Sequence, residues 1–259
     1  MSEGANTNST ASIARSVAAR ILWEMEFGVS GYPQTTPSST AIQAPTASPS
    51  KMSEKRAAAP PSVPPESSDT DPAAALHALH SAIGDCTRCE LHRGRTNLVF
   101  GEGNAHARLV FVGEGPGRDE DLAGRPFVGA AGQLLDRIIE AMGLTRGDVY
   151  ICNVVKCRPP NNRTPQESET NICGGFLRRQ LAVIRPSVIV ALGGTAATYL
   201  LGGPQAITRI RGQFQTLDGI PLRPTYHPAY LLRNPAEKRA VWNDMQRVME
   251  RLGLERKKS

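Results

Sequence analysis

The sequence predicts an α/β fold in which a central, mostly parallel sheet is covered by helices on both faces, giving a three-layer sandwich. Short apolar runs of strand length alternate with amphipathic runs of helix length after residue 72, the pattern of a sheet with crossover helices. The 187 residues that follow this point are enough for one domain of the class. The residues before it have a different composition, so we expect one folded domain, 73–259, behind an N-terminal extension.

Residues 1–72 are predicted to be a flexible, largely disordered extension. Nine of the 20 prolines and 13 Ser or Thr lie between Pro33 and Pro72, with almost no aliphatic run. Such a composition buries too little apolar surface to offset the entropy lost on ordering. Within the extension, Ile13, Val17 and Ile21 recur at helical spacing, which predicts a short amphipathic helix over residues 12–27. It could bind the domain or a partner protein, but a marginal helix on a flexible tether is the simplest interpretation.

The elements of the domain are expected in a regular order. Asp71 and Pro72 have the form of a cap and a first helical residue, so a helix begins there. Thr164, Pro165 and Glu167 have the form of a capping box that opens a helix ending near Ile184. The remaining expected elements are strands over 108–113, 148–155, 187–193 and 222–227, and helices over 131–144 and 235–252, with a short helix after residue 193.

Bulk composition excludes some classes of protein and favours others. No window approaches the ~20 apolar residues that span a bilayer, and no export signal is recognisable, so we expect a cytoplasmic protein of the bacterial cytosol or nucleoid. The folded part carries 25 Lys and Arg against 17 Asp and Glu, a net charge of +8. This balance favours an anionic partner, nucleic acid first.

Three unusual loops follow predicted strands. Residues 113–121 read GEGPGRDED, residues 157–165 read CRPPNNRTP and residues 227–235 read HPAYLLRNP. Ligands of open α/β sheets bind outside the carboxyl ends of the strands, so these loops predict the site. The glycines of the first loop allow a flat ligand to approach the main chain, although its spacing is not that of a dinucleotide-binding loop. Phe127 is either a core anchor or a stacking face for a base.

Four cysteines could converge on one metal site. Cys86 and Cys89 form a C-x2-C pair after the first helix, Cys157 follows a predicted strand and Cys173 lies in the next helix. Their spacing matches neither a zinc ribbon nor a ferredoxin, so it leaves open buried unliganded thiols, zinc, or iron and sulfur. Cys152 lies inside the strand and is expected to be a core thiol.

Polar residues at the strand ends are the remaining candidates. Asn153 presents a donor and an acceptor in a strand that should be buried, and is either a satisfied core amide or a reader of a planar ligand edge. Lys156 is a Schiff-base candidate, but strand alternation places it on the face opposite Asn153. After His227, the sequence places Leu231 and Leu232 beside Arg233, and we expect both leucines to be exposed as wedges that insert into a duplex.

Together these motifs resemble the family-4 uracil-DNA glycosylases, the iron-sulfur branch of that superfamily. The resemblance rests on GEGPGRDEDLAGRPFVGAAG, NVVKCRPPNNR and TYHPAYLLR with the four cysteines interleaved, and covers about residues 80–253. It implies a uracil-DNA glycosylase-like fold and a monofunctional enzyme that flips uracil out of DNA, hydrolyses its N-glycosidic bond and leaves an abasic site for base-excision repair. It also implies that Cys86, Cys89, Cys157 and Cys173 hold a structural 4Fe-4S cluster.

The resemblance further implies a role for each pocket residue. Phe127 stacks on uracil, Asn153 reads its O4 and N3 edge, and His227 donates to O2 of the departing base. Glu114 and Asn162 position the water or the sugar. Family-1 members carry Asp and Tyr where this sequence has Gly115 and Gly117, so Gly115 is carried over only as a substrate-contacting position, and Glu120 takes over the exclusion of thymine.

The implied partners are uracil-containing DNA, single- or double-stranded, and a repair or replication protein bound through the extension, with the enzyme itself a monomer and no membrane contact. The alternative is a non-catalytic metal-cluster module of the same fold that only binds nucleic acid.

Overall fold

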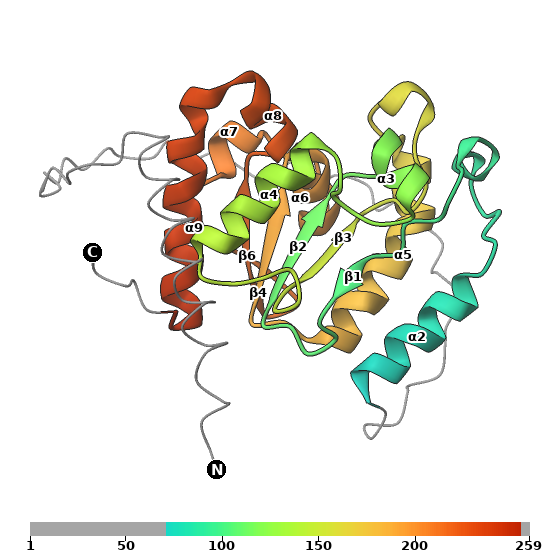
Figure 1. Ribbon diagram of the computed structural model, residues 1–259, viewed down its shortest axis with the longest axis horizontal. Helices are drawn as coiled ribbons and strands as arrows, with labels where there is room; N and C mark the ends of the chain where they lie inside the picture. Colours follow the sequence, from blue (N-terminus) through green and yellow to red (C-terminus); the bar gives the residue numbers. More distant parts are fainter. Residues whose placement is uncertain (1–70, 255–259) are drawn as a thin grey trace, which may run out of the picture.

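The computed structural model describes residues 71–254 (Figure 1). The extension and its expected helix therefore lie outside the described residues, except for Asp71 and Pro72. The strands are β1 (Glu102–Gly103), β2 (Leu109–Gly113), β3 (Tyr150–Asn153), β4 (Val188–Leu192), β5 (Gln215–Leu217) and β6 (Ile220–Thr225). The helices are α2 (Pro72–Ile83), α3 (Arg118–Ala123), α4 (Ala130–Ala141), α5 (Glu167–Ile184), α6 (Gly194–Leu201), α7 (Ile207–Ile210), α8 (Pro228–Arg233) and α9 (Lys238–Leu252), with 3-10 turns η1 (Glu90–Gly94), η2 (Pro160–Asn162) and η3 (Pro235–Glu237).

The strands form one mixed sheet in the order β1-β3-β2-β4-β6-β5. The four central strands are parallel, and the short outer strands β1 and β5 pair antiparallel to β3 and β6. The four parallel strands overlap the four strands expected from the sequence, which confirms the mostly parallel sheet. β1 and β5 were not predicted, because at two and three residues they carry no periodic signal.

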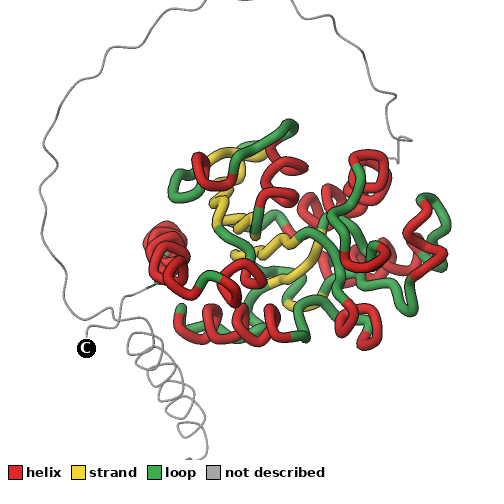
Figure 2. Tube along the Cα trace, turned by 90° about the horizontal axis from the view of Figure 1, so that it is seen from above, coloured by secondary structure: helices red, strands yellow, loops and turns green. Residues whose placement is uncertain are grey.

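Helices cover both faces of the sheet (Figures 1 and 2). Alternation along β2 turns Val110 and Val112 toward a core shared with α2, α5 and α6. It turns Leu109 and Phe111 toward a second core shared with α4, α8 and α9. In Figure 1, α4 crosses in front of the sheet and α5 lies behind it. This is the expected three-layer arrangement. No helix within residues 71–254 is both long and apolar enough to cross a bilayer.

Two helix starts differ in detail from the prediction. α2 begins at Pro72 after Asp71, as expected, but the Asp71 side chain makes no capping hydrogen bond. The capping box of α5 is formed not by Thr164 and Glu167 but by Gln166 and Glu169, whose Oε2 accepts from the Gln166 N–H at 2.7 Å. Arg163 pairs with the same Glu169 carboxylate, and this second partner fixes the later start of the helix.

The carboxyl ends of the parallel strands align at one edge. Gly113 at the end of β2 is paired with Asn153 at the end of β3, and Leu192 at the end of β4 is paired with Thr225 at the end of β6. The pairing continues into the loops, where Val155 N–H donates to the Glu114 carbonyl at 3.1 Å. The loops after β2 and β3 are therefore held side by side.

Candidate active site

A pocket of about 480 Å³ opens at this edge of the sheet. The three loops singled out in the sequence all contribute to it, as expected for a doubly covered sheet. Its lining residues are Glu114, Gly115, Pro116, Gly117, Glu120, Phe127, Ala131, Asn153, Pro159, Asn162, Arg163, Thr164, His227, Ala229, Tyr230 and Arg233. Every base- or sugar-contacting candidate of the sequence thus reaches one cavity.

Asn153 forms the floor of the pocket. Its backbone carbonyl accepts from the Lys156 Nζ at 2.8 Å, which holds the main chain in place. Its side-chain Oδ1 is buried and has no hydrogen-bond partner within the described residues. A buried acceptor without a donor is costly, so Asn153 is not a satisfied core amide. A Cβ on Gly113 would lie 2.4 Å from this oxygen and 2.6 Å from the Phe127 ring, so glycine keeps the floor open.

Phe127 is held in a backbone conformation that is rare for its residue type. Its φ is +53°, which costs ~1 kcal/mol or more and persists only where neighbours enforce it. The Glu120 Oε1 accepts from Val128 N–H and Gly129 N–H, both at 2.9 Å. Arg146 donates to the Phe127 carbonyl at 3.0 Å. The ring is buried in the core and also lines the pocket, so it is both a core anchor and a face of the site.

His227 lies beside Phe127, with 5.6 Å between the ring centroids. It caps α8, and its Nδ1 accepts from the Ala229 N–H at 3.1 Å. The proton of the neutral ring is therefore on Nε2. Burial lowers the pKa of His227 to about 4, with Arg233 acting in the same direction and Glu120 against it. His227 is a neutral hydrogen-bond donor at neutral pH.

Glu114 has a partner that the sequence did not indicate. The Thr195 hydroxyl, on α6, donates to Glu114 Oε2 at 2.5 Å, and the other oxygen has no hydrogen-bond partner within residues 71–254. Asn162 lies in a turn with φ of +54° and accepts from Arg158 Nε at 2.7 Å. A Cβ on Gly115 would lie 2.6 Å from Val155 Cγ2, so this position requires glycine for packing.

One expectation for the last loop is wrong. Leu231 is fully buried in the core against α4 and α9, whereas Leu232 is 42% exposed. The segment is a helix, α8, in which consecutive side chains point about 100° apart, and this turn directs Leu231 into the core and Leu232 away from it. Leu231 cannot be a wedge in this conformation. Leu232 and Arg233 are both exposed, beside the pocket that Arg233 lines.

Glu120 has a different set of contacts from the one expected of a residue that excludes thymine. Both of its oxygens are used by backbone N–H groups, Oε1 by Val128 and Gly129 and Oε2 by Gly117 at 3.1 Å. It shapes the first loop, although it also lines the pocket.

Lys156 is fully buried, and its Nζ donates to Gln180 Oε1 at 2.6 Å. It lines neither this pocket nor the surface, so it is not placed for Schiff-base chemistry.

The four cysteines lie where α2, α5 and the loop after β3 meet. Cys157 and Cys173 are buried, and Cys86 and Cys89 are partly exposed. Burial, together with neighbouring cysteine sulfurs, raises the pKa of the Cys89, Cys157 and Cys173 thiols, so the four sulfurs share one region. Within the described residues, no three His, Cys, Asp or Glu side chains are grouped closely enough to hold a single metal ion.

Hydrogen-bond donors surround these sulfurs. Arg88 donates to Cys86 Sγ at 3.2 Å, Arg95 to Cys157 Sγ at 3.3 Å, and the Lys156 N–H to Cys173 Sγ at 3.2 Å. Such donors stabilise thiolates and tune iron-sulfur centres. The sequence did not indicate Arg95, which donates to Cys157 Sγ, or Arg146, which donates to the Phe127 carbonyl. A single arginine in a polar loop has no distinguishing pattern.

Comparison with known proteins gives a consistent result. A family model described as "Uracil DNA glycosylase superfamily" matches residues 100–246. A type-4 uracil-DNA glycosylase of Thermotoga maritima is 54% identical over 177 residues, covering 67% of this chain and 92% of that protein. A type-4 uracil-DNA glycosylase of Saccharolobus solfataricus is 44% identical over 186 residues, 68% of this chain and 86% of that protein. A type-5 uracil-DNA glycosylase of Pyrobaculum aerophilum is 33% identical over 147 residues, 50% of this chain and 64% of that protein.

Proposed function

The chain belongs to the uracil DNA glycosylase superfamily, in its type-4 branch, and on this premise we propose that it takes uracil out of DNA by hydrolysing the N-glycosidic bond. The reaction releases free uracil, leaves an abasic site and begins base-excision repair. The enzyme is thus a hydrolase acting on N-glycosyl bonds. We place it in the cytoplasm of a bacterial-type cell, where the chromosome lies.

The unpaired Oδ1 of Asn153 is the observation that carries this proposal. Uracil offers a donor at N3 and an acceptor at O4, which match the amide oxygen and nitrogen of Asn153. Cytosine has the opposite pattern at these two atoms and would leave both groups buried and unpaired. A site built to pair with a substrate donor rejects an analogue that lacks it by a large factor.

Phe127 and His227 act on the two remaining sides of the base. The Phe127 ring offers an apolar face on which the flipped uracil stacks. Nε2–H of neutral His227 donates to uracil O2, where negative charge accumulates as the glycosidic bond breaks. A preorganised donor aimed at developing charge stabilises the transition state more than the ground state. The depressed pKa of His227 keeps this donor neutral at working pH.

The water that replaces uracil attacks the sugar carbon from the side of Glu114. The carboxylate oxygen of Glu114 that Thr195 does not bind orients this water and accepts a proton from it. The Thr195 hydroxyl holds the other carboxylate oxygen in place. Asn162 lines the same side of the pocket and contacts the sugar. Gly115 and Gly117 leave the main chain of this loop accessible to the nucleotide.

Extrusion of the nucleotide depends on α8. Flipping a base costs a few kcal/mol of stacking and pairing. We propose that Leu232, exposed at the end of α8, fills the vacated space, with Arg233 on an adjacent phosphate. Leu231 anchors the helix in the core and sets the direction of both residues.

Cys86, Cys89, Cys157 and Cys173 would hold a 4Fe-4S cluster. Four thiols without histidine or carboxylate are the donor set of such clusters. A cluster is wider than one ion, so ligands that share a region without grouping around a single point fit it better than they fit zinc. The nearby cationic donors Arg88 and Arg95 compensate its negative charge. When bound, the cluster supplies structural cross-linking, because hydrolysis transfers no electrons.

Uracil release tests the proposal directly. Purified brown protein is incubated with single-stranded DNA and with a duplex containing one U·G pair, and free base is quantified by chromatography. We expect uracil from both and none from matched DNA containing cytosine or thymine. Tight DNA binding without any free base would instead indicate the non-catalytic binding module.

A further inference from the structure

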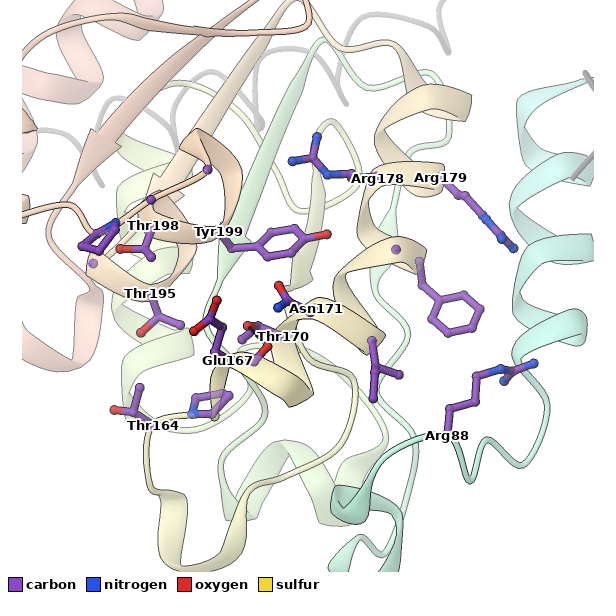
Figure 3. A pocket seen from close by; sticks show the side chains of 18 of the residues that line it. Arg88, Thr164, Glu167, Thr170, Asn171, Arg178, Arg179, Thr195, Thr198 and Tyr199 are labelled. Carbon is purple, nitrogen blue, oxygen red and sulfur yellow. Dashed lines mark hydrogen bonds between the residues drawn. The ribbon is translucent and has the colours of Figure 1, made fainter. Parts of the chain in front are cut away.

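A second cavity lies beside the catalytic pocket and is much larger. It is an open groove of about 1350 Å³ over α5 and α6, on the face of the sheet opposite α4 (Figure 3). Sites for small molecules are usually ~300–1000 Å³, so the groove is wider than one nucleotide requires. Figure 3 shows Tyr199 reaching from α6 toward α5, with Arg178 on the same side of α5 as Tyr199 and with Arg179 and Arg88 on the other side.

The groove crosses α5 at two glycines, Gly174 and Gly175. A Cβ on Gly174 would lie 2.0 Å from the Tyr199 ring, so packing accounts for that glycine. A Cβ on Gly175 would meet no atom within 4 Å. Glycine in a helix interior costs ~1 kcal/mol relative to alanine, and no contact of the described residues accounts for this cost at Gly175. Its bare backbone allows a ligand to lie across the helix.

Cations and aromatic rings alternate around these glycines. The Arg88 and Arg179 guanidinium carbons lie 5.2 and 5.8 Å from the centre of the Phe176 ring. Arg178 lies 5.5 Å from the centre of the Tyr199 ring. Within residues 71–254, no carboxylate forms an ion pair with Arg88 or Arg179. Arg178 has only a 3.7 Å contact with exposed Asp218. Positive groups interleaved with aromatic faces are typical of sites for single-stranded nucleic acid.

The groove adjoins the catalytic pocket. Thr164 lines both cavities. Thr195 lines the groove and bonds Glu114, which lines the pocket. From Glu167 to Arg178, α5 runs about 16 Å at 1.5 Å per residue.

We propose that this groove binds the unpaired DNA strand that continues from the flipped uracil. Arg178 and Arg179 would contact its phosphates, and the strand would cross α5 over Gly175. The inference rests on the proposed function, since it requires the uracil to be in the catalytic pocket. An acidic peptide would match the same charges, but the groove adjoins the catalytic pocket, and a strand whose uracil lies in that pocket already passes beside it.

Strand extension tests the proposal. A short single-stranded oligonucleotide with a central uracil is compared with the same sequence lengthened by thymidines on its 5′ or its 3′ side. Binding is measured by fluorescence anisotropy over a range of salt concentrations, and uracil release under single-turnover conditions. For the unaltered protein we expect lengthening on one side to tighten binding about fivefold or more, with a steeper salt dependence.

Substitutions in the groove should abolish the tighter binding of the lengthened oligonucleotide and leave uracil release from the short one unchanged. The double variant R178Q/R179Q should bind long and short oligonucleotides equally, and its salt slope should fall by about 1.4, at ~0.7 for each phosphate contact of a single strand. G175L, which favours the helix and fills the open space, should lose the gain without a change in charge. Both should release uracil from the short oligonucleotide at the unaltered rate. R247Q, at an exposed arginine of α9, is the matched control and should keep the gain.

Three outcomes separate the explanations. A length gain that survives in R178Q/R179Q and G175L overturns the inference. Binding of a glutamate-rich peptide that these variants lose, with the length gain intact, assigns the groove to a protein partner and also overturns it. No uracil release from the short oligonucleotide by the unaltered protein contradicts the proposed function instead.

Discussion

Asn153 and Cys157 are four residues apart, yet they lie in opposite chemical surroundings. Beside Asn153 lie the Phe127 ring, the neutral His227 ring and Glu120, whose carboxylate is already bonded to backbone N–H groups, and the Asn153 amide oxygen is left unpaired. Around Cys157, arginine guanidinium groups point at sulfur. The first environment suits the hydrogen-bond pattern of an uncharged ring, and the second suits negatively charged sulfur. On the proposed function, one short segment therefore serves recognition at one end and structure at the other.

Lys156 connects the two environments. Its Nζ donates to the Asn153 carbonyl, and its backbone N–H donates to Cys173 Sγ. Movement of the cysteine end would therefore be transmitted to the floor of the pocket. Variants at each end should separate local effects from transmitted ones.

Cys157→Ala is expected to have the largest effect. Loss of one ligand should bleach the brown colour and lower the free energy of unfolding by several kcal/mol, because binding of a structural metal centre is coupled to folding. Uracil release should fall as well, since the floor loses its support. Visible absorption, thermal unfolding and uracil release measure the three effects.

Cys152→Ala is the matched control for that change. Cys152 is also buried but lies within β3, in the core. Its removal should leave the colour unchanged and cost only the packing of a small side chain. Equal bleaching in both variants would contradict the assignment of ligands.

Asn153→Leu should have the next largest effect, at the other end of the segment. A side chain of similar size without the amide should lower the single-turnover rate of uracil release by about 10²–10³-fold, as for loss of one preorganised polar contact. Colour and thermal unfolding should stay close to those of the unaltered protein. A variant that loses colour together with activity would show that the two environments cannot be separated.

The parts of this molecule that were predictable from sequence share a physical cause. Two of the four parallel strands, β2 and β4, are continuous apolar runs, and the ends of all four meet at one edge because parallel strands align there. This is why loops far apart in sequence could be assigned to one pocket. The roles of the individual pocket residues and cysteines came from the family resemblance, and those roles remain proposals.

The features that were not predicted depend on tertiary contacts, which leave no periodic pattern in the sequence. Leu231 and Leu232 are chemically identical neighbours, and only the helical turn of α8 decides which one is buried. The capping box of α5 moved by two residues because Arg163 pairs with Glu169. The Thr195 contact with Glu114 joins residues 81 positions apart, a separation at which spacing carries no information.

Thr195→Val should have a smaller effect, confined to the pocket. Without the hydroxyl donor, the Glu114 carboxylate is no longer fixed, and we expect kcat to fall about tenfold, equivalent to ~1.4 kcal/mol, with KM unchanged. Thr195→Ser should restore the rate, because serine keeps the donor. Steady-state kinetics on a uracil-containing single strand measure both.

Thr198→Val is the control for Thr195→Val. Thr198 lies on the same helix, and its hydroxyl accepts from Gln205 N–H at 3.1 Å, away from Glu114. It should leave kcat unchanged. A loss of the same size in Thr198→Val, or no recovery in Thr195→Ser, would assign the effect to α6 stability rather than to Glu114.

The remaining prediction concerns the pH dependence of stability, to which His227 contributes. The pKa of His227 is about 4 in the folded protein, lowered by burial, and ~6.5 in an unfolded chain. Between these values the unfolded state binds more protons, so acidification from pH 6.5 toward pH 4 should destabilise the protein by up to about 1.4 kcal/mol per pH unit. Above pH 6.5 this contribution is complete and constant.

Denaturant unfolding at each pH measures this contribution. The stability of His227→Gln should fall less on acidification than that of the unaltered protein, whereas His77→Gln, at an exposed histidine, should follow the unaltered protein. Parallel curves for His227→Gln and the unaltered protein would mean that His227 is not held neutral by burial, and a neutral donor to uracil would then be untenable.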